Sequence, residues 1–255
     1  MSNSKLVNYT KLTPHCTKGR KHKIDTITIH HMAGNISVET CGQVFLTRQA
    51  SANYGVDGKG RVGLYVDEGD RAWSTAKPTN DNRAVNIEVA NCGGAPDWPV
   101  SDAALDKLIE LVADICKRNG IKKLVWGETR SDRTGHKNGC NMTVHQDFMA
   151  TSCPGPYLLE RMPRIAAEVN KLLGADGSGN PQPAPDGADK PLFAAPYTVR
   201  VSVTDLPILS GPGSDFPRRG LVPPGVYTIV AEQDGFGRLK SGAGWIELAR
   251  TTKTG

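Results

Sequence analysis

The chain has 255 residues, 38% of them hydrophobic and 22% charged, a composition typical of globular proteins rather than disordered or membrane-embedded ones. No apolar run approaches the ~20 residues of a membrane-spanning helix, so we expect no membrane insertion. The net charge of +5 is a mild positive bias, which fits an ordinary solvated surface and leaves open attraction to an anionic partner such as a bacterial cell wall. The densest basic run, "KGRKHK" at residues 18–23, has no interleaved aromatic residues, so we expect no nucleic acid partner.

The first 23 residues are polar and basic and lack the apolar segment of a secretory signal. We therefore expect the chain to be made in the cytoplasm and to stay there until something else releases it. Without a secretory signal, cysteines are more often free thiols or metal ligands than disulfides. The six cysteines are Cys16, Cys41, Cys92, Cys116, Cys140 and Cys153.

Strands and helices alternate through the first part of the chain. The β-branched run "IDTITIH" at residues 24–30 predicts a strand. Residues 37–48 begin with a capping serine and predict a helix. The stretch "SANYGVDGKGRVGLYV" predicts two strands around a turn at residues 57–60, and residues 84–91 predict another strand.

The strongest helix is predicted for residues 101–120. Ser101 is a good N-cap and Gly120 a good stop signal. One apolar stripe joins them, made of Leu105, Leu108, Ile109, Val112 and Ile115.

Residues 124–126 predict a further strand, and residues 157–174 a helix that Pro163 kinks or divides. This alternation predicts an α/β fold with a mixed central sheet flanked by helices. We expect this domain to span residues 1–173.

Residues 174–195 are rich in Gly, Pro, Ala and Asp and predict a flexible linker. From residue 196 to residue 255 the sequence pattern changes to short strand-like segments separated by turns that contain Gly, Pro and Asp. This pattern predicts a second, small all-β barrel, with Trp245 in its core.

Two separated stretches offer metal ligands. "TVHQDFMATSCPG" places His145 and Cys153 eight positions apart, and "TITIHHMAG" contains two adjacent histidines. Neighbouring strand residues face opposite ways, so only one of this pair can point into a site. His30 shares its face with Thr26 and Thr28, and this more polar face favours His30 over His31. Zinc takes such nitrogen and sulfur ligands, three of them in catalytic sites.

A rival arrangement lies within the later region. His136, Cys140, His145 and Cys153 would form a closed structural zinc site. Their spacing lacks the paired C-x-x-C knuckles of common zinc modules, so we favour the three-ligand site. His136 and Cys140 then belong to a polar loop that borders the cleft.

Four motifs, "ITIHHMA", "SANYGVDGKGRV", "NRAVNIEVAN" and "VHQDFMATSCPG", follow one another in this order and spacing. Together they resemble the zinc-dependent N-acetylmuramoyl-L-alanine amidases, a family that includes phage endolysins and peptidoglycan-recognition proteins. The resemblance covers residues 24–173 and implies Zn²⁺ bound by His30, His145 and Cys153.

The resemblance also implies catalytic roles. Glu88 in "NIEVAN" falls where some members carry a catalytic glutamate, and we expect it to be the general base. Tyr54 and Thr151 fall on positions that would stabilise the oxyanion. The tail, with "ILSGPGSDF" and "GAGWIEL", resembles bacterial SH3-like wall-binding domains.

The expected function is therefore hydrolysis of the amide between N-acetylmuramic acid and L-alanine in bacterial cell-wall peptidoglycan, as a phage or prophage endolysin. Two other classes remain open. One is a non-catalytic peptidoglycan-binding recognition protein, which the intact ligand set disfavours. The other is a nucleic-acid protein with structural zinc, which the missing knuckles disfavour.

Overall fold

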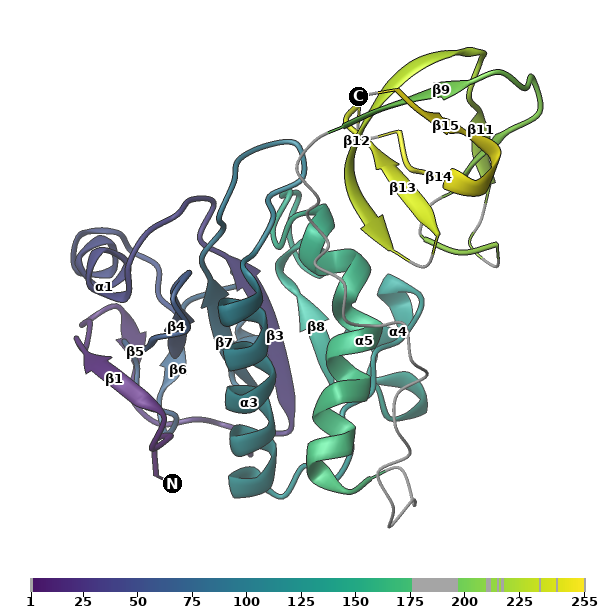
Figure 1. Ribbon diagram of the computed structural model, residues 1–255. Helices are drawn as coiled ribbons and strands as arrows, with labels where there is room; N and C mark the ends of the chain where they lie inside the picture. Colours follow the sequence, from purple (N-terminus) through teal and green to yellow (C-terminus); the bar gives the residue numbers. More distant parts are fainter. Residues whose placement is uncertain are drawn as a thin grey trace. The chain divides into compact units, whose positions relative to one another are not determined.

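The computed structural model describes residues 2–175, 197–209, 212–214, 216, 218–233, 235–241 and 243–254. The chain forms two compact units, Met1–Gly179 and Asn180–Gly255 (Figure 1). The predicted linker at residues 174–195 lies outside the described residues, apart from its first two positions. No described helix combines the length and apolar character that a membrane crossing requires.

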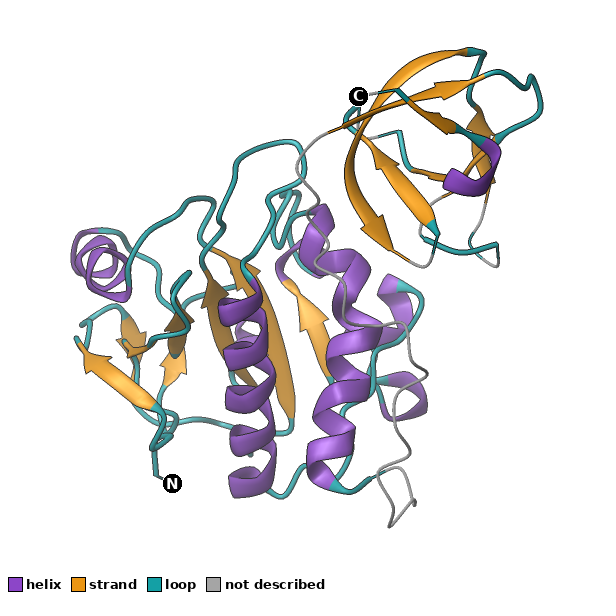
Figure 2. Ribbon diagram, in the orientation of Figure 1, coloured by secondary structure: helices purple, strands orange, loops and turns teal. Residues whose placement is uncertain are grey.

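A six-stranded mixed sheet forms the centre of the N-terminal unit (Figure 2). The inner strand β3 pairs in parallel with β7 on one side and with β8 on the other. β7 pairs in parallel with β4, and β4 pairs antiparallel with β5. In spatial order, the strands are β1 (Val7–Thr10), β5 (Val62–Leu64), β4 (Tyr54–Val56), β7 (Ala84–Val89), β3 (Thr26–His31) and β8 (Met142–Val144).

Two long helices, α3 (Asp102–Asn119) and α5 (Pro156–Leu173), lie side by side over one face of this sheet (Figure 1). α1 (Val38–Thr47) lies near β5 and β4, and the short α2 (Pro78–Asp81) lies near β7. α4 (Arg130–Thr134) lies beside β8. The mixed sheet flanked by helices confirms the predicted architecture of this unit.

Local signals at the helix ends are confirmed. The Ser37 side chain accepts a hydrogen bond from Thr40 N at the start of α1, and Ser101 does the same with Ala104 N at the start of α3. Gly120 ends α3 in the left-handed conformation, with φ of 69°. The expected turn between β4 and β5 is also present, where Gly60 N donates to Asp57 O.

Two local predictions are wrong. Residues 124–126 form no strand, and Trp126 makes only an isolated bridge with Met142. α5 runs as one helix through Pro163, which is exposed, so this proline does not divide the helix. Sequence reasoning also did not identify β1, the short pair β2 (Cys16–Thr17) and β6 (Arg71–Ala72), or β8.

The described part of the C-terminal unit is built of β-strands and one short 3₁₀ turn, η3 (Leu248–Arg250). Its core contains Val199, Val201 and Ile229, and Trp245 is buried as expected. The SH3-like identity of this unit stays a prediction. Its strands, in spatial order, are β11 (Arg218–Leu221), β10 (Pro207–Leu209), β14 (Trp245–Glu247), β13 (Phe236–Leu239), β12 (Gly225–Gln233), β9 (Tyr197–Val201) and β15 (Thr252–Lys253).

The two faces of the central sheet differ in chemistry. Ile27, Ile29 and Ile87 belong to the apolar core, together with side chains of α3 and α5. The alternate positions Thr28, His30 and Asn86 are also fully or almost fully buried, but they are polar. Because side chains alternate along a strand, one face supplies the hydrophobic core and the other is free to build a polar site.

Tyr54 lies within the apolar core, in register with Ile87. Its hydroxyl donates to Glu68 Oε1 at 2.6 Å and accepts from Ser4 N at 2.9 Å. Arg118 donates two further hydrogen bonds to the Glu68 carboxylate, so that this buried charge is paired. The Tyr54 hydroxyl therefore links the N-terminal segment to β4 and to the end of α3.

We expect Tyr54→Phe to lower the free energy of unfolding by about 1–3 kcal/mol, because the buried Ser4 N loses its partner and Glu68 loses one of its hydrogen bonds. Urea denaturation measures this change. Tyr9→Phe is the matched control, since the Tyr9 hydroxyl makes no hydrogen bond within the described residues, and it should change stability by less than ~0.5 kcal/mol. Equal stability of the two variants would contradict a structural role for the Tyr54 hydroxyl.

Candidate metal centre

Three side chains from distant segments meet at one end of the central sheet. His30, His145 and Cys153 each offer a ligand atom, and all three atoms lie within 4.8 Å of one another. His30 is near the end of β3, and His145 opens the 3₁₀ turn η2 (His145–Asp147) that directly follows β8. Because β3 and β8 are parallel neighbours, their carboxyl ends meet at the same edge.

The rival four-ligand site is not formed. Within the described residues, no other group of His, Cys, Asp or Glu has metal-ligand spacing. The His136 ring instead bonds the carbonyl oxygen of Cys140 at 3.0 Å, within its own loop. The structure therefore excludes this rival site at His136, Cys140, His145 and Cys153, which the sequence already disfavoured.

The hydrogen bonds of His30 indicate which nitrogen faces the ligands. Its Nε2 lies 3.1 Å from Asn86 Oδ1, and its Nδ1 lies 3.7 Å from Cys153 Sγ. An amide oxygen only accepts, so Nε2 carries the proton and Nδ1 presents a lone pair. Such an outer partner fixes the tautomer and the ring orientation of a metal-binding histidine.

The other two ligands come from loops that are tied together. Gln146 N donates to Cys153 O at 3.1 Å, which joins the turn of His145 to the loop of Cys153. Gly155 follows with φ of +82°, and a Cβ there would lie 2.9 Å from Trp98 Cβ. Only glycine suits that backbone, so the glycine two positions after the cysteine has a geometric function.

Burial keeps all three ligands uncharged in the metal-free protein. It lowers the pKa of His30 to about 3, and the neighbouring His145 adds to this effect. Burial also lowers the pKa of His145 and raises the pKa of the Cys153 thiol, with Glu88 contributing to the latter. Neutral imidazoles are ready to bind a cation, and a coordinated thiol loses its proton.

The donor set fits zinc. His145 Nε2 is buried without a hydrogen-bond partner among the described residues, although buried polar atoms are usually paired. A metal held by this nitrogen, His30 Nδ1 and Cys153 Sγ would satisfy it. Two imidazoles and one thiolate match a catalytic zinc site with an open fourth position.

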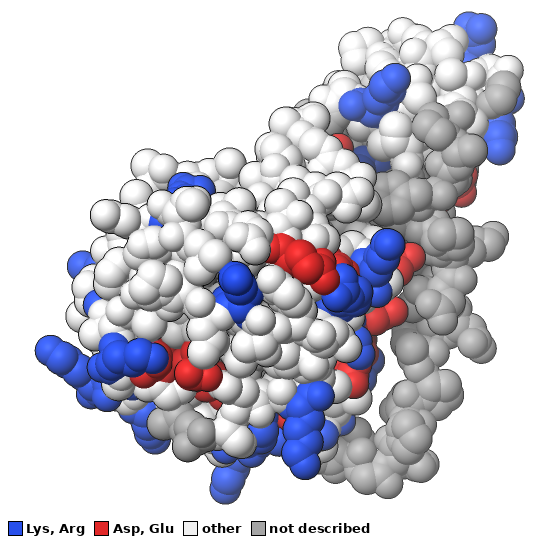
Figure 3. Space-filling model, turned by 90° about the vertical axis from the view of Figure 1, so that its left-hand side faces the viewer, with Lys and Arg blue, Asp and Glu red and all other residues white. Residues whose placement is uncertain are grey.

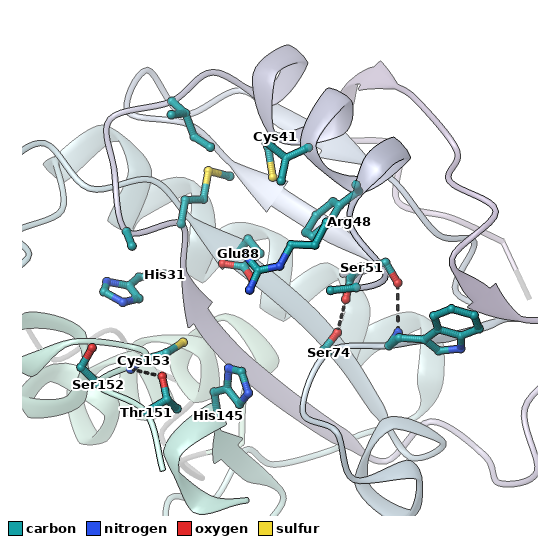
Figure 4. A pocket seen from close by; sticks show the side chains of 17 residues that line it. His31, Cys41, Arg48, Ser51, Ser74, Glu88, His145, Thr151, Ser152 and Cys153 are labelled. Carbon is teal, nitrogen blue, oxygen red and sulfur yellow. Dashed lines mark hydrogen bonds between the residues drawn. The ribbon is translucent and has the colours of Figure 1, made fainter. Parts of the chain in front are cut away.

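A pocket opens directly above these ligands (Figure 4). His145 and Cys153 form one side of it, and Glu88 and Arg48 lie next to each other across from them. The wall beneath α1 is largely apolar and includes Met32, Ile36, Val44 and Phe45. The pocket therefore combines two candidate metal ligands, a carboxyl group and an apolar surface.

Glu88 is the carboxyl group that lines the pocket. It lies on β7 in register with His30, so both point to the same face of the sheet. Burial raises the pKa of Glu88 to about 8, against which the charge of Arg48 acts. Its Oε2 has no hydrogen-bond partner among the described residues and remains able to accept a proton.

Thr151 lines the pocket, whereas Tyr54 does not. Thr151 Oγ1 accepts a hydrogen bond from Cys153 N at 3.2 Å, which leaves its hydroxyl hydrogen available to a ligand. Tyr54 points to the opposite face, because Glu88 is in register with Gly55 rather than with Tyr54. The structure therefore does not bring Tyr54 to the predicted site.

Two tryptophans lie near the site, Trp73 in the pocket and Trp98 against His31. Trp73 lines the pocket, and its Nε1 donates to Thr17 Oγ1 at 2.9 Å. Trp98 packs edge-on against His31, with ring centroids 5.2 Å apart. His31 also lines the pocket, but it does not belong to the group of His30, His145 and Cys153, which agrees with the choice of His30 as the candidate ligand.

Sequence reasoning did not identify Asn86 or Arg48. Asn86 lies two positions before Glu88, and a polar residue inside a buried strand was a usable signal. Arg48 is exposed at the C-cap of α1, and nothing in its local sequence distinguishes it from other surface arginines. Figure 3 shows Lys and Arg on one face of the molecule in several separate groups rather than in a single patch.

The family model described as N-acetylmuramoyl-L-alanine amidase matches residues 20–156, more than half of the chain. No curated protein matches the sequence.

Solved structures similar to the chain include PlyL, with 20% identity over 68% of this chain and 98% of that chain and a TM-score of 0.47. A mutant endolysin from Bacillus subtilis has 16% identity over 64% and 99%, with a TM-score of 0.46. Peptidoglycan recognition protein SD from drosophila has 20% identity over 57% and 84%, with a TM-score of 0.42. These structural likenesses are distant, and the family assignment rests on the sequence match: the chain belongs to the N-acetylmuramoyl-L-alanine amidase family.

Proposed function

We propose that this chain is a zinc-dependent peptidoglycan hydrolase that cleaves the amide between N-acetylmuramic acid and L-alanine. The observation that carries the proposal is the buried group of His30, His145 and Cys153, of which His145 and Cys153 line a pocket that also contains Glu88. Membership in the amidase family supplies the reaction class. Bacterial cell-wall peptidoglycan is the partner that this reaction requires.

His30, His145 and Cys153 would hold the zinc. When bound, zinc polarises a substrate carbonyl and makes a water molecule more acidic. Glu88 accepts a proton from the attacking water and returns it to the departing amine nitrogen, which converts a poor leaving group into a neutral amine. The open pocket beside Glu88 Oε2 is the space for that water.

Thr151 and Arg48 are placed to stabilise negative charge. The Thr151 hydroxyl hydrogen is free to donate to the oxyanion that develops on the carbonyl oxygen. Arg48 extends over the pocket beside Glu88 and brings a positive charge to the same region (Figure 4). We assign no catalytic step to Tyr54, because its hydroxyl is bonded to Glu68 in the core.

We further propose that the chain acts as a phage or prophage endolysin that reaches the wall after release through the membrane. In this proposal the all-β C-terminal unit, at residues 196–255, is an SH3-like wall-binding domain. Residues 174–195 link it to the catalytic domain at residues 1–173. Tethering to an insoluble polymer raises the local concentration of the catalytic pocket without any new contact in it.

Purified bacterial walls should be cut only by the metal-loaded protein. We expect free N-terminal L-alanine to appear with the zinc-loaded protein, to disappear after chelation and to return when zinc is restored, without new reducing sugar ends. Dinitrophenylation measures the newly freed amino groups of L-alanine, and a reducing-sugar assay separately measures any newly freed sugar ends. Walls that are bound by the zinc-loaded protein but left intact would identify a recognition protein instead.

Glu88→Gln should reduce the rate of wall cleavage by about 10²–10⁴-fold, because the amide cannot accept the proton of the water. Zinc content should remain unchanged, since Glu88 is not among the ligands, and atomic absorption checks this. Glu39→Gln is the matched control: Glu39 pairs with Arg61 on the surface, and its loss should leave cleavage near the wild-type rate. Full activity of Glu88→Gln would remove Glu88 from the mechanism.

A further inference from the structure

The turn that carries His145 is closed by a buried carboxylate. Asp147 is 2% exposed, and its Oδ2 accepts a hydrogen bond from Val144 N at 3.0 Å. This bond spans His145, because it joins the residue before the ligand to the residue two positions after it. The orientation of the Asp147 carboxylate therefore sets the backbone path at His145.

Arg133 fixes that carboxylate from α4. Its Nη2 donates to Asp147 Oδ1 at 2.7 Å, and its Nε donates to Oδ2 at 2.9 Å. This two-pronged geometry defines both the position and the plane of the carboxylate, which a single ammonium group cannot do.

The guanidinium of Arg133 makes further contacts with two backbone carbonyl oxygens and with an aromatic ring. Its Nη1 donates to the carbonyl oxygens of Gly127 and Glu128, at 2.9 and 3.1 Å. Its central carbon lies 4.2 Å from the centre of the Trp126 ring. Arg133 is 7% exposed, so this arrangement has little freedom to change.

A second arginine of α4 forms a hydrogen bond with the same turn. Arg130 Nε donates to the backbone oxygen of Asp147 at 2.6 Å. The start of α4 is fixed by a reciprocal capping box between Thr129 and Asp132. The polar loop before β8, which our sequence analysis placed at the border of the cleft, thus supports the turn of a metal ligand.

We propose that Arg133 is a positioning residue for metal binding, acting through Asp147 on His145. His30 lies on a strand, where the sheet defines its direction. His145 lies in a one-turn 3₁₀ segment, which does not hold its own geometry without outside contacts. The Arg133–Asp147 pair supplies those contacts and keeps His145 Nε2 within reach of His30 and Cys153. This inference rests on the proposed function only in that a metal binds at this group.

The test compares zinc affinity in the full chain, by competition with a chromophoric chelator, between the wild type and Arg133→Lys. Lysine keeps the positive charge but loses the two-pronged contact. We expect the zinc Kd to rise about 10–100-fold, the range typical for loss of a partner behind a metal ligand. Thermal unfolding of the metal-free proteins is measured in parallel, because a purely structural role would lower stability and leave the Kd unchanged.

Arg83→Lys is the matched control. Arg83 makes a similar two-pronged pair with Asp25, at 2.7 and 2.9 Å, but at the opposite end of β3 from His30. Its zinc Kd should equal that of the wild type. An Arg133→Lys protein that is folded and binds zinc within twofold of the wild type would overturn the proposal.

Arg130→Gln decides the question if Arg133→Lys does not fold, because Arg130 is exposed and its loss leaves the buried pair intact. We expect a smaller rise in Kd in the same direction, and an unchanged Kd would overturn the proposal. Neither measurement involves cell walls. A wild type that binds zinc but does not cut walls would therefore contradict the proposed function and leave this inference standing.

Discussion

The parallel pairing of β3 with β7 and β8 is the constraint on which the site depends. It brings the carboxyl ends of three strands to one edge of the sheet, so that His30, Glu88 and the turn of His145 arrive together although they are distant in sequence. The register of these strands therefore decides which residues face the site and which face the hydrophobic core. His30 pairs with Glu88, and a shift of one residue in either strand would turn one of them into the hydrophobic core.

A polar site on a buried sheet is stable only if the buried polar groups beneath it find hydrogen-bond partners. Thr28 and Thr143 bond each other through their hydroxyls at 2.8 Å, and Asn80 Nδ2 donates to Thr28 at 3.0 Å. Asn86 bonds His30 directly above them. This network pairs the buried threonine hydroxyls and gives the candidate ligand His30 a rigid support. Among the described residues, the atoms on this face without a hydrogen-bond partner are Asn86 Nδ2, His145 Nε2 and Glu88 Oε2, and the last two belong to residues that line the pocket.

Much of the fold could be predicted because its signals are local. Ser101 and Gly120 mark the ends of α3, and the apolar stripe between them defines its buried face. The choice of His30 over His31 also needed only the alternation of a strand. The prediction of a strand at residues 124–126 failed because a short apolar run does not reveal whether a partner edge is available, and here Trp126 finds only Met142.

The site residues that depend on register could not be derived in the same way. Tyr54 was expected beside the metal. The face of the sheet to which its side chain points is set by its pairing with Ile87, and no local sequence pattern contains that pairing. Arg133 lies 14 positions from Asp147, and their contact arises from the path of the intervening loop. Arg48 reaches the pocket only because α1 ends above Glu88 (Figure 4). Such contacts belong to the tertiary structure rather than to the sequence pattern.

X-ray absorption at the zinc edge tests the central claim most directly, because it reports the atoms bound to the metal. We expect two nitrogen ligands at about 2.0–2.1 Å and one sulfur ligand at about 2.3 Å, with one lighter ligand completing the shell. Cys153→Ser should abolish the sulfur contribution. A shell with two or more sulfur atoms, or a sulfur contribution that survives this substitution, would contradict a site built from His30, His145 and Cys153.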